Sequence, residues 1–176
     1  MLKEVTNAET QNQLARQENI TANLTQELIT TRQDVHEEIW EKCSAGWRYF
    51  QGSYYYFSTE RKTWAGSRDA CVNMGGHLVI VETREEQYFL QTQKPKPFCW
   101  IGLTDSAKEG EWRWVDNTPL SSSITFWAGG QPDNKDGSRG QDCTGLYTTR
   151  NGRWLLWDDR YCGNKDIYIC EVKDSK

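Results

Sequence analysis

The cysteines and tryptophans are confined to one part of the chain. All six cysteines lie at or after Cys43, and all nine tryptophans lie between Trp40 and Trp157. Residues 1–42 contain one aromatic residue, Trp40, and neither glycine nor proline. Because a hydrophobic core needs large apolar side chains, the core of this 176-residue chain must form in its second part. The sequence therefore predicts a helical segment over residues 1–42 and a cysteine-rich domain over residues 43–176.

The charge pattern and the short sequence signals indicate where such a protein works. The net charge is -4 and the basic residues are scattered, which argues against a nucleic-acid partner. The sequence has no run of eighteen apolar residues and its start is not apolar, so we expect contact with a membrane only through an anchor outside this sequence. Asn19 and Asn23 each begin an Asn-X-Thr glycosylation motif. Together with six cysteines, these motifs indicate an extracellular protein.

Residues 3–42 are polar and free of helix breakers, which favours a long exposed helix. In the best heptad frame Leu14, Leu28 and Val35 take a positions and Leu24 takes a d position. Polar residues dilute this seam, namely Thr10, Gln17, Thr21, Thr31 and Glu38. Asn19 and Asn23 fall outside the seam, at f and c. The pattern predicts a coiled-coil neck that joins copies of the chain, and the alternative is a polar, frayed linker.

The cysteine-rich domain shows short elements of both kinds, which predicts the α+β class. Apolar spacing favours one helix from Trp64 that ends at Gly75-Gly76, and a second helix that begins at Thr83 with a Thr83/Glu86 capping box. Short strands are expected at 54–57, 100–103, 112–114, 155–157 and 168–170. Residues 104–141 lack regular patterning and include GGQPDNKDGSRGQDC at 129–143. Loops of this length are usually functional or held by a ligand, and these oxygen-bearing side chains suit a hard cation.

Several motifs occur in an order that carries a resemblance. They are Cys71, GGHLV at 75–79, WIGL at 100–103, EGEWRW at 109–114, QPDN at 131–134, Cys143, WDD at 157–159, Cys162 and Cys170. Over residues 43–172 the chain resembles a C-type lectin-like domain, which implies two helices, short antiparallel sheets and a long Ca²⁺-stabilised loop. With its neck helix it further resembles the extracellular part of a type II receptor of the hepatic galactose-receptor and dendritic-cell-lectin group. The resemblance implies the ectodomain of such a receptor or a secreted lectin.

The resemblance also implies a disulfide pattern. Cys71 would pair with Cys170, and Cys143 with Cys162. Two cysteines are then left over, because Ser53 stands where long-form relatives have the partner of Cys43. The sequence leaves three alternatives: Cys43 pairs with Cys99, Cys43 links two necks, or Cys99 is a small buried apolar residue.

The resemblance implies two sets of Ca²⁺ ligands in the long loop and in the strand after it. A cis proline triplet and a later acid pair would form the sugar-site set, Gln131, Asp133, Gln141, Asp158 and Asp159. A second set would hold a supporting Ca²⁺, Asp105, Glu109, Asn134 and Asp142. The alternative is that these residues are only turn formers.

Three functional classes can be compared on these residues. Only two histidines are present, His36 and His77, and the sequence offers no convincing nucleophile and base, so we expect no enzyme. Many lectin-like domains bind proteins without Ca²⁺, but this chain keeps both the proline triplet and the acid pair. We therefore expect Ca²⁺-dependent binding of carbohydrate, for glycan or pathogen recognition at a surface.

The order of the triplet predicts the kind of sugar. Gln131-Pro132-Asp133 resembles the galactose-type relatives, which makes galactose or N-acetylgalactosamine the first expectation. Two departures favour some tolerance for mannose or fucose. Residues 134–140 contain no aromatic side chain, and Gln141 and Asp158 exchange the acid and the amide of the usual second pair.

Overall fold

The computed structural model describes residues 2–44, 46–93, 98–121, 124–135, 140–149 and 155–174, with side chains described for these except 2–8, 34–44 and 155. The chain divides into two compact units, residues 1–45 and 46–176, and each is described by itself. Within the described residues, no helix is both long enough and apolar enough to cross a lipid bilayer.

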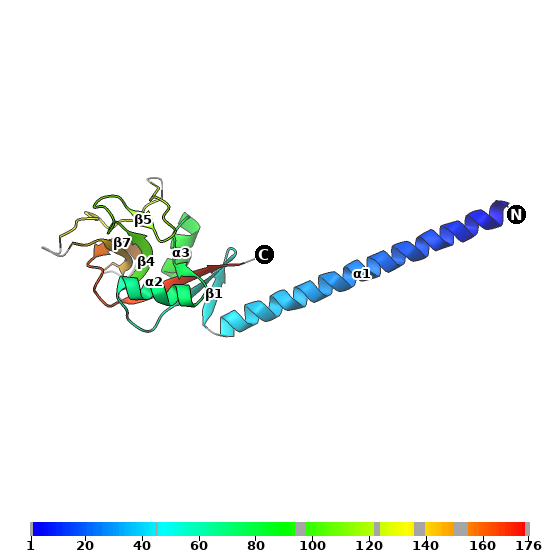
Figure 1. The fold of residues 1–176 in the computed structure, drawn as a ribbon, viewed down its shortest axis with the longest axis horizontal. Coiled ribbons are helices and arrows are strands. Elements are labelled where there is room, and N and C mark those ends of the chain that lie inside the picture. The colour runs from blue at the N-terminus through cyan, green and yellow to red at the C-terminus, as the bar shows by residue number, and fades with distance from the viewer. Residues whose placement is uncertain are drawn as a thin grey trace. The chain divides into compact units, whose positions relative to one another are not determined.

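The first unit is one helix, α1 (Leu2–Ser44), which agrees with the long helix expected over residues 3–42 (Figure 1). Leu14, Leu24 and Leu28 of the predicted seam are exposed by 60%, 55% and 71%, so this single chain leaves the seam uncovered. The threonine hydroxyls at 21, 25, 30 and 31 donate to carbonyl oxygens one turn earlier. The side chains of Val35 and Glu38 lie outside the described residues, and the coiled coil stays a prediction.

The second unit is built on a sheet. Its strands in the described part of the chain are β1 (Trp47–Phe50), β2 (Ser53–Phe57), β3 (His77–Leu78), β4 (Phe98–Thr104), β5 (Arg113–Trp114), β6 (Cys143–Thr148), β7 (Leu155–Arg160) and β8 (Ile167–Lys173). The strand order is β1-β2-β8-β4-β6-β7, with β3 beside β8 and β5 beside β4. All pairs are antiparallel except β4 with β8. The predicted α+β fold is confirmed, and the parallel pair is an addition to it.

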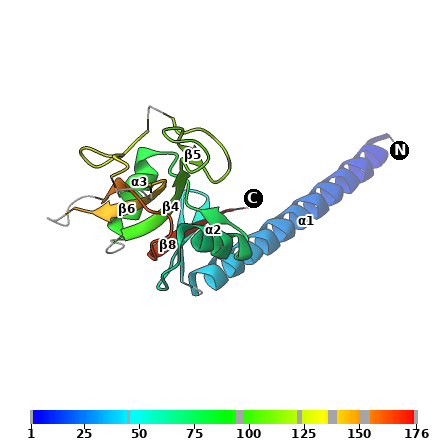
Figure 2. The same ribbon diagram turned by 60° about the vertical axis from the view of Figure 1, so that its left-hand side comes forward.

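Two helices accompany this sheet, α2 (Trp64–Asn73) and α3 (Arg84–Thr92), and Figure 2 shows both. Thr63 caps α2 by accepting a hydrogen bond from the backbone N–H of Gly66. Thr83 caps α3 in the same way from Glu86. Only half of the expected capping box forms, because the Glu86 carboxylate accepts from the backbone N–H of Glu82 and not from that of Thr83.

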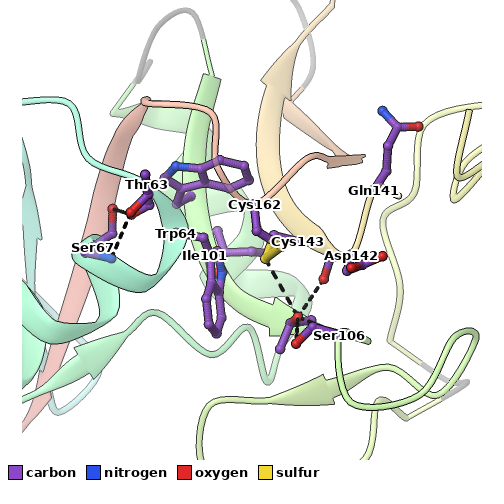
Figure 3. The surroundings of a disulfide bond; sticks show 12 residues. Thr63, Trp64, Ser67, Ile101, Ser106, Gln141, Asp142, Cys143 and Cys162 are labelled. Atoms are coloured by element: carbon purple, nitrogen blue, oxygen red, sulfur yellow. Dashed lines mark hydrogen bonds between the residues drawn. A yellow bond between two sulfur atoms is a disulfide. The ribbon is translucent and has the colours of Figure 1, made fainter. Parts of the chain in front are cut away.

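Large apolar side chains fill the interior around β4 and β7. Trp100 and Trp157 are fully buried, and Trp100 packs edge-on against Phe98. Cys71 pairs with Cys170, which joins α2 to β8, and Cys143 pairs with Cys162, which joins the start of β6 to the turn after β7. Both bridges implied by the resemblance are therefore present. Figure 3 shows the second bridge, with Gln141 and Asp142 directly before it in the chain.

The alternative in which Cys43 pairs with Cys99 is wrong, because Cys99 is a free cysteine. Cys99 lies in β4 with no exposed surface, among the apolar residues of the main core cluster. This burial raises the pKa of its thiol well above the ordinary value. Cys99 is therefore a small buried apolar residue, which was one of the alternatives. The side chain of Cys43 lies outside the described residues.

Candidate functional site

The acid pair Asp158–Asp159 is placed by β7, whose two edges hold different parts of the site. On one edge β7 pairs with β6, so that Gly145 lies opposite Asp158 and Thr144 opposite Asp159. On the other edge the backbone of Trp157 exchanges hydrogen bonds with Phe126 and Ala128 of the long loop. The loop therefore leaves the strand only three residues before Gln131. This pairing brings the proline triplet to the acid pair.

Asp159 organises the proline triplet through backbone hydrogen bonds. Its side chain is fully buried, and its carboxylate accepts from the N–H of Asp133 at 3.2 Å and from that of Asn134 at 2.9 Å. The Gln131–Pro132 peptide bond between these segments is cis, as the resemblance implies. Asp159 thus holds the loop that follows the proline against β7.

Gln141 closes the same loop from its far end. Its Oε1 accepts from the N–H of Lys135 at 2.6 Å, and its Nε2 donates to the backbone carbonyl of Asp159 at 3.1 Å. Its own N–H donates to Oδ1 of Asn134 at 2.6 Å. The side chain of Gln141 therefore joins both ends of the loop to β7.

Two of the three acids of this set, Asp133 and Asp158, are paired with cations of the protein. Asp133 Oδ2 lies 3.1 Å from Lys135 Nζ, and Asp158 Oδ2 lies 3.3 Å from Arg160 Nε. Burial raises the pKa of Asp158, and the negative charges of Asp159 and Asp133 act in the same direction while Arg160 opposes them. The acids are thus close enough for their negative charges to repel one another, and a bound cation would reduce this repulsion.

The second predicted set also comes together. Asn134 Nδ2 donates to Glu109 Oε2 at 2.7 Å, and the N–H of Asp105 donates to the carbonyl of Asp142 at 3.1 Å. Asp105 is 3% exposed, and one of its carboxylate oxygens accepts from the N–H of Gly110 at 2.8 Å. Burial raises the pKa of Asp105, with Glu109 and Asp142 adding to the effect.

Each set contains one buried oxygen without a partner among the described residues. These atoms are Oε1 of Gln131 in the first set and Oδ1 of Asp105 in the second. A buried acceptor that makes no hydrogen bond costs free energy, and a hard cation with oxygen ligands removes that cost. No three His, Cys, Asp or Glu side chains in the described ranges gather as a metal site. Each candidate set contains three carboxylates, so the acids of a set do not by themselves converge on one point in the described structure, and the amides of Gln131, Gln141 and Asn134 complete the sets.

All nine predicted ligand residues therefore lie on the loop and the strands beside it, and contacts link most of them. The structure brings Asp133, Gln141 and Asp159 into direct hydrogen-bond contact. Residues 136–139 of the quoted loop lie outside the described part. Sequence reasoning missed Lys135 and Arg160 as counter-ions, although each is within two residues of an acid in the first set.

Known proteins resemble this chain at the level of both sequence and fold. The model of the C-type lectin domain matches residues 60–172. C-type lectin domain family 4 member E of Mus musculus is 41% identical over 133 residues, which cover 75% of this chain and 61% of the relative. The chain thus spans about three fifths of the length of this curated relative.

Two solved structures are similar to the chain. The mouse scavenger receptor C-type lectin carbohydrate-recognition domain has a TM-score of 0.65 and 36% identity, and covers 74% of this chain and 95% of its own. The trimeric structure of a Kupffer cell C-type lectin receptor has a TM-score of 0.71 and 33% identity, and covers 84% of this chain and 95% of its own. With the two disulfides, the cis proline triplet and the matching family model in place, the chain belongs to the C-type lectin family of non-enzymatic, carbohydrate-recognising proteins.

Proposed function

We propose that this protein is an extracellular lectin that binds a carbohydrate ligand through Ca²⁺. Gln131, Asp133, Gln141, Asp158 and Asp159 hold the sugar-site Ca²⁺, while Asp105, Glu109, Asn134 and Asp142 hold the supporting ion. The observation that carries this proposal is the buried, unpartnered oxygen in each set, Gln131 Oε1 and Asp105 Oδ1. Three carboxylates in the first set supply the charge that a divalent ion needs.

The protein's own groups decide how a sugar would be held. Bound Ca²⁺ supplies open coordination positions for two neighbouring hydroxyls of a sugar. Around it a carboxylate oxygen accepts a hydrogen bond from a hydroxyl, and an amide N–H donates one. Asp133 and Asp158 are each about one fifth exposed at their side chains, so they can reach a ligand at the surface. Lys135 and Arg160 then have to give up part of their pairing with these acids.

The sugar is proposed to be galactose or N-acetylgalactosamine, with tolerance for mannose or fucose. The order Gln131-Pro132-Asp133 supports the galactose type. The exchanged pair Gln141 and Asp158 reverses the direction of two hydrogen bonds, which favours wider acceptance of vicinal diols, since the polarity of the pocket sets discrimination.

Several copies of the chain would have to bind together for the protein to hold a glycan-bearing surface tightly. A single shallow site binds a sugar weakly, and linked sites bind a glycan-dense surface with much higher avidity. The exposed seam of α1 supports a neck over residues 1–42 that joins copies of the lectin domain at 43–176. Glycans on Asn19 and Asn23 would lie off that seam. The two disulfides support an oxidising, extracellular location.

Binding to immobilised galactose tests the proposal. We expect retention in Ca²⁺ and release by chelator, with free galactose competing better than mannose or fucose. The Asp159→Asn variant serves as the site control and should not be retained. Retention that chelator does not affect would contradict the proposal and would favour a protein or sugar ligand bound without metal.

The double variant Gln141→Glu with Asp158→Asn tests the sugar preference separately. It restores the usual order of the second pair, so we expect it to exclude mannose more strongly than the wild type does. If the wild type already excludes mannose as fully as the double variant, the exchanged pair does not influence specificity.

A further inference from the structure

The helix α3 makes a buried polar contact with the strand that carries the acid pair. The indole Nε1 of Trp157 donates a hydrogen bond to Oε1 of Gln87 at 3.1 Å. Gln87 is 4% exposed and Trp157 has no exposed surface, so water does not compete for this contact. Trp157 directly precedes Asp158 and Asp159 in the chain. The contact therefore acts one residue away from the proposed site.

Trp157 contacts both parts of that site, because it belongs to the strand that carries the acid pair and binds the loop segment that leads to the proline triplet. Its backbone N–H donates to the carbonyl of Phe126 at 2.7 Å, and its carbonyl accepts from the N–H of Ala128 at 2.8 Å. Its ring packs edge-on against Phe126, at 5.5 Å between centroids, and against Trp127 at 5.6 Å. The segment held in this way leads within three residues to Gln131. A shift of Trp157 would thus move the acid pair and the proline triplet relative to each other.

Gln87 fixes the orientation of the Trp157 indole, which the contacts with the neighbouring aromatic rings do not fix. The aromatic neighbours of Trp157 approach edge-on, and such contacts tolerate modest rotation and sliding of the indole. A hydrogen bond to the single indole N–H fixes the ring in its plane. The same turn of α3 also contacts the loop segment before the proline triplet, because the guanidinium of Arg84 lies 5.9 Å from the centre of the Phe126 ring.

We infer that Gln87 is a positioning residue of the Ca²⁺ and sugar site, which acts through the indole of Trp157. This inference rests on the proposed function and adds to it a residue far from the loop in sequence. Gln87 lies 70 residues before Trp157 and belongs to neither ligand set. Its effect is on the relative placement of Asp159 and Gln131, and therefore on the affinity for the metal.

A double-mutant cycle on the full chain tests this role. Gln87→Met keeps the length of the side chain and removes the acceptor, and Trp157→Phe removes the donor. Gln93→Met is the matched control, because Gln93 caps the C-terminal end of the same helix and its side chain donates to Phe89 and Thr92 there. Ca²⁺ affinity is measured by calorimetry at a temperature where every variant is folded, and each indole N–H is followed by NMR.

We expect Gln87→Met to weaken Ca²⁺ binding about tenfold, as the loss of an outer partner of a metal site typically does. It should also shift the indole N–H signal that Trp157→Phe deletes. The double variant should bind no more weakly than Trp157→Phe alone, because the indole donor through which Gln87 acts is already absent from that single variant. Gln93→Met should bind as the wild type does.

Two results would overturn the inference, and they differ from the result that overturns the proposed function. One is a wild type that binds Ca²⁺ with a Gln87→Met variant of equal affinity. The other is a Gln93→Met variant that weakens Ca²⁺ binding as much as Gln87→Met does, which would make the loss a general effect of substitutions at this helix. A wild type that binds no Ca²⁺ at all would instead remove the proposed function, and this inference with it.

Discussion

The sheet with α2 and α3 and the long loop that follows β4 are ordered by different forces. Around β4 and β8 the chain buries Trp100, Leu78 and Ile169 completely, and Cys71–Cys170 ties α2 to the last strand. Around the proline triplet the order comes from hydrogen bonds to the Asp159 carboxylate and the Gln141 amide. Apolar burial does not depend on charge, whereas the loop gathers acids that repel one another.

This contrast teaches that the two regions should respond to different changes. The sheet should be sensitive to shape, because its interior has no room for added atoms. The loop should tolerate added atoms and should be sensitive to cations, because polar contacts hold it.

A pair of glycines separates the two regions most strongly. A Cβ at Gly76 would overlap the Glu171 carbonyl oxygen and lie 2.6 Å from Cγ2 of Val172, whereas a Cβ at Gly129 in the loop would meet nothing within 4 Å. We expect Gly76→Ala to lower the free energy of unfolding by about 3 kcal/mol and Gly129→Ala to change it by less than about 0.5 kcal/mol. Denaturant unfolding measures both, and equal losses would show that the loop is as tightly packed as the sheet.

A buried acid within the sheet region gives the next largest effect. Glu86 is 6% exposed as a residue. Its carboxyl accepts a hydrogen bond from the Tyr55 hydroxyl at 2.9 Å, and burial raises its pKa from 4.5 to about 7. Since the folded pKa is the higher one, folding takes up a proton. The stabilisation is complete below about pH 4.5 and is lost as the pH rises through about 7.

The Glu86→Gln variant should flatten this dependence. We expect the free energy of unfolding of the wild type to fall by about 2 kcal/mol from this group between pH 5 and pH 7, and that of the variant to stay nearly level. Unfolding is measured in chelator, so that metal binding does not contribute. Glu85→Gln is the control, because Glu85 is its exposed neighbour in α3. A Glu85→Gln variant that flattens the curve equally would refute the assignment to Glu86.

The neck should have the smallest effect on the lectin domain and a large effect on avidity. Deleting residues 1–42 removes no residue of the core clusters, so the free energy of unfolding of the domain should change by less than about 0.5 kcal/mol. Light scattering should show an oligomer that becomes a monomer on deletion. Retention on a glycan-dense surface should fall by about a hundredfold or more. A monomeric full-length chain at high concentration would contradict the neck prediction.

Local patterns in the sequence were sufficient for the helices of the lectin domain. The apolar spacing from Trp64 and the cap at Thr83 predict α2 and α3, since a helix is defined by neighbours three and four residues apart. The strands β1, β3 and β6 were not predicted. β3 and β6 are defined by partners distant in the chain, β8 and β4 respectively, whereas β1 has only four residues and pairs with the neighbouring β2.

The sequence motifs predicted the ligand positions of the site but not the hydrogen bonds between them. The nine ligand residues were found because the resemblance names their positions, and the loop and β7 bring them together. Their internal partners depend on side-chain direction, which a motif does not fix. Gln141 bonding to Lys135 is one example, and Gln87 bonding to Trp157 across 70 residues is another. Cys99 shows the same limit, because the sequence around a cysteine does not show whether its side chain forms a disulfide or lies free in the core.

Amide hydrogen exchange with and without Ca²⁺ tests most directly the claim that a cation orders the loop and not the sheet. We expect Ca²⁺ to slow exchange at Asp133, Asn134 and Lys135, whose N–H groups bond within the site. Exchange at Trp100 and Ile169 in the core should stay the same. Protection that is unchanged in the loop, or that rises equally in the loop and the core, would contradict this account.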